Sequence, residues 1–169
     1  MLDRSGAVMV RDSDPSTAGA GFRPARFGLA FPGTAGSVRG ALTTVRSALR
    51  GMGVPQETCG IVEFVLAEVL NNIVEHAYAG NAAGFVELDL ERREGALAFE
   101  MRDWGHPMPG SAAPDGQPKD LEVPIPDLPE GGFGWHLIRS LTLDLSYDRT
   151  GSANVLRFLV PLNGVATLQ

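Results

Sequence analysis

The chain has 169 residues, a length that fits one domain with a single hydrophobic core. Hydrophobic residues make up 44% of the chain and charged residues 20%, so disorder throughout the chain is excluded. The formal net charge is -6, and Lys and Arg form no run. This composition argues against a surface that binds nucleic acid directly.

Targeting and redox features of the sequence point to the cytoplasm. The single cysteine, Cys59, cannot form an internal disulfide, so we expect a reducing compartment. Residues 1–22 are polar and glycine-rich and lack the apolar stretch of a signal peptide. No segment approaches the roughly 20 apolar residues that span a bilayer, so no membrane partner is expected.

The first half of the chain is predicted to contain one strand and two helices. Residues 1–24 lack periodicity and are expected to form a flexible N-terminal arm. A short strand over 26–31 follows, and then a helix over about 35–51. A second helix is predicted from Pro55 to about Ala79, because its apolar residues also recur at helical spacing.

The second half of the chain alternates between apolar and polar residues, which is typical of strands. One hairpin is predicted over 84–102 and another over 143–160, with a short helix over 133–141 between them. Together these elements predict an α+β domain over 25–162, followed by a C-terminal tail. The expected architecture is a two-layer sandwich, with helices packed on one face of a mixed, mainly antiparallel sheet.

The segment over 106–132 interrupts this pattern. It holds seven of the chain's twelve prolines and shows no sustained periodicity. A loop of this length inside a compact domain is usually either a functional lid or a disordered segment. Its position between two glycine-containing turns favours a lid.

The second predicted helix carries a polar stripe beside its apolar face. Glu68, Asn72 and His76 recur at four-residue spacing, which places them on one side of a helix. The Asn side-chain oxygen can coordinate magnesium, and the Glu carboxylate can accept a proton from a nucleophile. Taken alone, the same stripe also fits an ordinary solvated helix face.

Two glycine-containing turns supply further candidate residues. Asp103 ends a predicted strand and is followed by Gly105, so its carboxylate can accept a hydrogen bond from the amine of a base such as adenine. Gly132 and Gly134 precede a predicted helix, whose free backbone amides suit phosphate oxygens. Taken alone, the first turn also fits an ordinary chain reversal. The glycine spacing matches neither a Walker loop nor a dinucleotide-binding fold.

In this order, the motifs resemble those of the GHKL (Bergerat-fold) ATPases, and among these the anti-sigma factor serine/threonine kinases with their histidine-kinase-like ATPase domain. The resemblance covers about residues 26–160. The stretch Glu68–Tyr78 resembles the Asn box of the family, and Asp103-Trp-Gly105 its first glycine box. The second box is matched by Gly132-Phe-Gly134 with Leu137-Ile-Arg139, and the last by Thr150-Gly-Ser-Ala-Asn-Val-Leu-Arg157.

The resemblance implies a role for each matching residue. Asn72 would be the magnesium ligand, Glu68 the general base and Asp103 the acceptor for the adenine amine. Arg39 on the first helix would face a protein partner. The nucleotide-binding set implied by the resemblance is Asn72, His76, Asp103, Gly105, Gly132, Phe133, Gly134, Trp135 and Ser152.

The resemblance also implies a function, with ATP as substrate and Mg2+ as cofactor. The domain would phosphorylate a Ser or Thr of a small anti-sigma-factor antagonist of the STAS type, sequester a sigma factor and form a homodimer. A nucleotide-gated binding module is an alternative, because the lid segment holds one Lys against five acidic residues. The catalytic domain of a sensor histidine kinase is disfavoured, since only about 25 residues precede the domain.

Overall fold

The computed structural model describes residues 9–12, 25–79, 84–115 and 133–163. In chain order the elements are β1 (Met9–Asp12), β2 (Arg26–Pro32), α1 (Ala35–Gly51), α2 (Gln56–Asn72), the π-helical turn η1 (Ile73–Ala77), β3 (Phe85–Arg92), β4 (Ala96–Asp103), the 3-10 turn η2 (Pro109–Ser111), α3 (Phe133–Leu141), β5 (Leu143–Thr150) and β6 (Ala153–Pro161).

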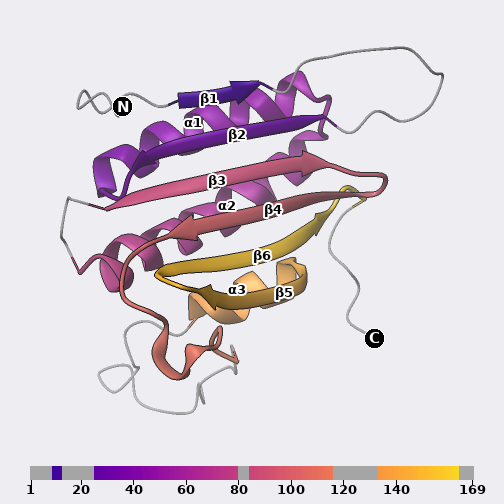
Figure 1. Cartoon of the computed structure of the whole chain (residues 1–169). Coiled ribbons are helices and arrows are strands. Elements are labelled where there is room, and N and C mark those ends of the chain that lie inside the picture. Colours follow the sequence, from indigo (N-terminus) through magenta and orange to yellow (C-terminus); the bar gives the residue numbers. More distant parts are fainter. Residues whose placement is uncertain (1–8, 13–24, 80–83, 116–132, 164–169) are drawn as a thin grey trace, which may run out of the picture.

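The strands form one sheet with the order β1-β2-β3-β4-β6-β5. Every pairing between the described strands is antiparallel. The three long helices lie on one face of this sheet, with α1 behind β1 and β2, α2 behind the centre and α3 behind β5 and β6 (Figure 1). The predicted α+β two-layer sandwich is therefore confirmed.

The core lies between the helices and the sheet, because the apolar side chains of both layers face each other. Phe31, Leu66 and Phe158, which come from β2, α2 and β6, are each no more than 2% exposed. Burying a side chain of this size typically contributes about 1.5–3 kcal/mol. Within the described residues, no helix is both long and apolar enough to cross a membrane.

Helix α1 begins and ends where the sequence predicts, because both ends carry clear signals. The Thr34 side chain caps the first turn by accepting the Ser37 backbone N–H at 3.3 Å. At the other end, Gly53 adopts a φ of 68°, a left-handed conformation that favours glycine.

Part of the predicted N-terminal arm forms a strand. Met9–Asp12 pairs with Phe27–Ala30 as the edge strand β1. A segment of four residues is too short to show the alternating pattern from which a strand is predicted. An edge strand is also held by backbone hydrogen bonds, which any side chain allows. The remaining residues of the arm lie outside the described residues.

The second helix changes its geometry near the polar stripe. It is α-helical to Asn72, and the π-helical turn η1 then runs to Ala77. The Tyr78 backbone N–H donates to the Ile73 carbonyl, five residues earlier, at 3.0 Å. Single π turns inside helices are frequent at functional sites.

Tyr78 locks the end of this helix against the sheet. A Cβ atom placed on Gly33 would lie 2.5 Å from the Tyr78 ring, and one placed on Gly84 would lie 2.0 Å from it. The ring therefore fills a slot that needs glycine at both positions. Its hydroxyl accepts the Trp104 backbone N–H at 3.1 Å and donates to the Phe85 carbonyl. Burial raises the pKa of Tyr78.

Candidate functional site

A cavity of about 820 Å³ opens between α2, η1, the chain after β4, the start of α3 and the β5–β6 hairpin. This volume lies within the usual range of small-molecule sites. The predicted site residues that line it are Glu68, Asn72, His76, Asp103, Gly134 and Trp135. The structure thus brings together side chains that come from helices and a strand far apart in the sequence.

Asp103 forms what we call the base end of the cavity. It is the last residue of β4 and is only 6% exposed. Its Oδ1 atom accepts the Gly105 backbone N–H at 2.9 Å and the Asn154 side-chain amide at 2.7 Å. Burial raises the pKa of Asp103, while these two donors and the positive charge of Arg149 partly oppose that rise.

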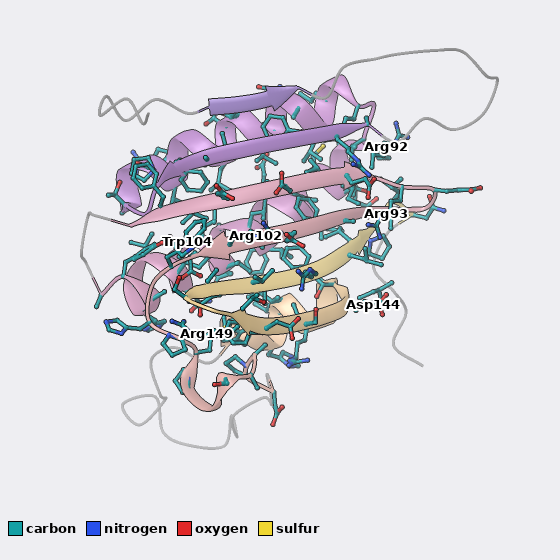
Figure 2. The ribbon with its side chains drawn as sticks, viewed as in Figure 1. Arg92, Arg93, Arg102, Trp104, Asp144 and Arg149 are labelled. Carbon is teal, nitrogen blue, oxygen red and sulfur yellow. The ribbon has the colours of Figure 1, made fainter. Side chains whose placement is uncertain are left out.

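Asn154 lies within the stretch that resembles the last box, but the sequence analysis assigned it no role in the site. It lies on β6 directly opposite Asp103 and is 3% exposed. Its side-chain amide also donates to the His106 carbonyl at 3.1 Å. Its Oδ1 atom accepts hydrogen bonds from the Tyr147 hydroxyl at 2.7 Å and from Arg149 at 2.5 Å. Figure 2 shows Arg149 and Trp104 at the same end of the sheet.

A signal for Asn154 was present in the alternation of β6. Residue 154 is in phase with Leu156, Phe158 and Val160, which all face the helices and are buried. A polar residue at an inward position of a strand needs partners for its hydrogen-bonding groups. That requirement marks Asn154 as a member of a buried network.

Glu68, Asn72 and Gly134 form what we call the phosphate end of the cavity. A Cβ atom placed on Gly134 would lie 2.5 Å from Glu68 Oε2, so this carboxylate lies against the first turn of α3. The Asn72 amide nitrogen donates to the Glu68 backbone carbonyl at 2.8 Å. The Asn72 side-chain oxygen accepts no hydrogen bond from the described residues, so it is available to a ligand. The N-terminus of α3 supplies a positive dipole end that suits phosphate oxygens.

Gly105 shapes the site by packing. A Cβ atom placed on it would lie 2.4 Å from the Ala77 carbonyl oxygen, which also accepts the His106 backbone N–H at 2.8 Å. Gly105 thus lets the chain after β4 approach the end of η1. It lines a neighbouring groove with Trp104 rather than the main cavity.

Other predicted residues lie away from the cavity or outside the described part. Ser152 is exposed in the β5–β6 turn, and Arg39 is exposed on α1; neither lines the cavity. Gly132 lies outside the described residues, as does the predicted lid from residue 116 onward. Phe133 begins α3, but its side chain is not among the described ones.

The donor set fits a magnesium ion that arrives with its nucleotide. Among the described residues, no group of three or more His, Cys, Asp or Glu side chains is arranged to hold a metal ion. Magnesium is commonly bound through one or two side chains together with substrate phosphates. Asn72 lies at the cavity wall, and its side-chain oxygen, which accepts no hydrogen bond within the described part of the chain, meets that requirement.

Comparison with known proteins decides the family. The family model of the histidine kinase-like ATPase domain matches residues 31–160. The chain belongs to this family. The GHKL resemblance expected from the motifs is thereby confirmed, and membership of an ATPase family implies that the domain binds ATP.

Two curated relatives of this histidine kinase-like ATPase domain differ in their activities. The chain is 29% identical over 120 residues to the blue-light-activated histidine kinase 2 of Erythrobacter litoralis (strain HTCC2594), an alignment that covers 68% of the chain and 31% of that relative. It is 27% identical over 109 residues to the serine-protein kinase RsbW of Oceanobacillus iheyensis, with 64% of the chain and 69% of the relative covered. The chain therefore spans under a third of the length of the first relative.

Proposed function

We propose that this domain transfers the terminal phosphate of MgATP to a serine or threonine hydroxyl of a partner protein, as a kinase of the anti-sigma factor type. The observation that carries the proposal is the single cavity that holds Asp103 at its base end and Glu68 with Asn72 at its phosphate end. Similarity to a serine-protein kinase over 69% of that relative supports this acceptor.

At the base end, Asp103 would accept a hydrogen bond from the adenine amine. The carboxylate is buried and its Oδ1 atom is already held by two donors, so it is oriented before the nucleotide binds. Trp135 also lines the cavity and would contact the nucleotide. Preorganisation of this kind lowers the entropy cost of binding.

At the phosphate end, Glu68 would accept the proton of the acceptor hydroxyl. The hydroxyl oxygen then forms a bond to the terminal phosphorus, the bond from that phosphorus to its bridging oxygen breaks, and ADP leaves with the bonding electrons. The first turn of α3, against which Glu68 lies, would stabilise negative charge on the phosphates. Magnesium, held by Asn72 and the phosphates, would neutralise part of the same charge.

The partners predicted from the sequence remain proposals. The proposed phosphate acceptor is a small anti-sigma-factor antagonist of the STAS type, and a sigma factor would be sequestered by the same domain, acting as a homodimer. Arg39 is exposed on α1, so it is accessible to a protein partner. A cytoplasmic location follows from the same proposal.

The test incubates the purified chain with ATP labelled on its terminal phosphate, magnesium and a STAS-type antagonist encoded in the same genome. We expect magnesium-dependent label on the antagonist that survives acid, as phosphoserine and phosphothreonine do. Acid-labile label would point to a histidine acceptor, the activity named in the first relative. No label on any acceptor, despite ATP binding, would overturn the kinase proposal.

A second candidate is a nucleotide-gated binding module with little chemistry. The observation that favours it is the charge of the segment 106–132, which has one Lys against five acidic residues to hold a terminal phosphate. In that case the antagonist would bind more tightly with ATP than with ADP, and no phosphate would be transferred. Measuring affinity with both nucleotides beside the transfer assay separates the two functions.

A further inference from the structure

We propose that Arg139 is a positioning residue that holds one wall of the cavity, the chain segment 107–115, against α3, so that the cavity keeps its shape before the nucleotide binds. The inference rests on the proposed function, because it takes the cavity as the ATP site. The sequence analysis placed Arg139 in the stretch that resembles the second glycine box and gave it no role. Its role follows from hydrogen bonds that its side chain makes outside the helix.

The wall segment 107–115 is the described part of the predicted lid. The residues by which it lines the cavity are Pro107, Met108, Pro109, Pro114 and Asp115. Most of them are prolines, which have no backbone N–H to donate, so the segment has few groups of its own with which to form regular structure. Hydrogen bonds from neighbouring elements are therefore needed to hold it in place.

The start of the wall segment is tied to the sheet. The Met108 backbone N–H donates to the Tyr147 hydroxyl of β5 at 3.0 Å, and the Met108 carbonyl accepts the Ser111 backbone N–H at 3.0 Å. The chain then turns through Gly110 and Ser111, which have φ values of 69° and 54°. A serine in this left-handed region is strained and persists only where its surroundings hold it. The turn therefore depends on ties on both of its sides.

The end of the wall segment is tied to α3 by Arg139. The guanidinium donates through Nε to the Pro114 carbonyl at 2.7 Å and through Nη2 to the Ala113 carbonyl at 3.1 Å. Ala113 is only 9% exposed, so its carbonyl needs a hydrogen-bond partner from the protein. The planar guanidinium carries its donors in a fixed fork, so its two bonds set both the position and the direction of the chain.

Helix α3 gives this clamp a firm base beside the cavity. Arg139 lies one helical turn after Trp135, so both side chains project from the same side of α3, and Trp135 lines the cavity. Ile138 is fully buried, and the Thr142 hydroxyl donates to its carbonyl at 2.7 Å. The clamp therefore sets the spacing between the wall segment and the helix whose first turn is proposed to hold the phosphates.

The clamp acts on nucleotide binding rather than on the transfer of phosphate. A wall that is already in place needs little ordering when ATP binds, whereas a loose wall must be ordered at the expense of affinity. Glu68 lies against Gly134, at the other end of α3 from Arg139. Loss of the clamp should therefore raise the KM for ATP and leave kcat near that of the wild type.

The experiment compares the full-length wild type with Arg139→Met and Arg139→Lys in magnesium. Arg139→Met keeps an apolar stem but removes both bonds, so the Kd for ATP, measured by calorimetry, and the KM should rise by about 5–30-fold, with kcat changed less than about twofold. Arg139→Lys keeps the charge without the fork and should recover only part of the affinity. Ser140→Ala is the matched control, because its hydroxyl bonds within α3 to the Leu137 carbonyl, and it should bind ATP as the wild type does.

Amide hydrogen exchange at Ser111 tests the clamp without any enzyme assay. In the nucleotide-free protein, exchange there should be about tenfold faster in Arg139→Met than in the wild type, because the turn opens more often, and saturating ATP should slow it again. Unchanged exchange or unchanged ATP affinity in a folded Arg139→Met protein would overturn the role of Arg139, and Arg139→Lys gives the same test if Arg139→Met does not fold. A wild type that binds no ATP would overturn the proposed function instead, and exchange at Ser111 would still test the clamp.

Discussion

The two ends of the cavity are built in different ways. At the base end, Asp103 and Asn154 are at most 6% exposed, and each makes several hydrogen bonds to neighbouring strands and to the chain after β4. At the phosphate end, Glu68 and Asn72 are only half-buried, and the bond between them runs from the Asn72 side chain to a backbone carbonyl.

The difference separates recognition from chemistry. A buried carboxylate with one oxygen held by two donors is rigid, which suits a group that identifies one base. A half-buried carboxylate that makes no such bonds to the described residues can move, which suits a group that must approach an incoming hydroxyl. Changes at the base end should therefore alter binding and stability together, whereas changes at the phosphate end should alter phosphate transfer and leave the fold intact.

The largest effect should come from the phosphate end. Glu68→Ala removes the proposed proton acceptor, so phosphate transfer should fall by about 10²–10⁴-fold while ATP affinity stays near that of the wild type. Transfer is followed with labelled ATP and affinity by calorimetry. Glu57→Ala, in the first turn of the same helix, is the control and should change neither quantity.

Asn72→Ala sharpens the same assignment, because it should abolish the magnesium-dependent part of ATP binding. If Glu68→Ala and Asn72→Ala lost ATP binding equally, the roles given to the two residues would be wrong.

The next effect is expected at the base end. Asp103→Asn replaces the acceptor with an uncharged amide and should weaken ATP binding by about 10–150-fold, the usual range for a lost hydrogen bond to a charged group. In the wild type, ATP affinity should fall as the pH is lowered through the raised pKa of Asp103, because the protonated acid is a poorer acceptor. Asp89→Asn, exposed on β3, should bind ATP as the wild type does.

A smaller effect, on stability, is expected for Gly105→Ala. The added Cβ would meet the Ala77 backbone carbonyl, which cannot move without disturbing η1, so we expect a loss of about 1–3 kcal/mol in the free energy of unfolding. Urea denaturation measures this loss. Gly60→Ala, in α2 with open space around the added atom, should instead gain up to about 1 kcal/mol. Equal stability of both variants would contradict the packing role of Gly105.

The smallest effect on the fold is expected for Gly134→Ala. Here the added Cβ would meet only the end of the Glu68 side chain, which can rotate away. The free energy of unfolding should therefore change by less than about 0.5 kcal/mol, while phosphate transfer should decrease several-fold because the carboxylate is displaced. A stability loss as large as that of Gly105→Ala would show that the two ends do not differ as described.

The sequence predicted most of the fold because its local signals agree with one another. The helix over 35–51 has a capping Thr before it and glycines at its end, and both hairpins alternate clearly around glycine turns. The strand β1 and the π turn η1 were missed for physical reasons. Strand β1 has only four residues, too few to show an alternating pattern. In η1 the change from i+4 to i+5 hydrogen bonds requires no particular residue type, so the sequence does not indicate it.

The candidate site was predicted unevenly. Glu68, Asn72 and Asp103 were found because the chemistry of their side chains suits a nucleotide at that spacing, and the cavity brings them together. The role of Asn154 was missed because it depends on the position of Asn154 opposite Asp103. The pairing of β4 with β6 cannot be predicted from the sequence of either strand alone. Gly105 packs against Ala77, and its expected place at the nucleotide stays a prediction.

The slot that holds Tyr78 restricts how the helical layer and the sheet can move relative to each other. The ring packs directly against the backbone at Gly33 and at Gly84, where there is no side chain that could move aside. Sliding of the helical layer over the sheet at this end would have to expel the ring and break its bond to the Trp104 N–H. We therefore expect slow amide hydrogen exchange at Trp104, and fast exchange there would show that this end of the domain opens readily.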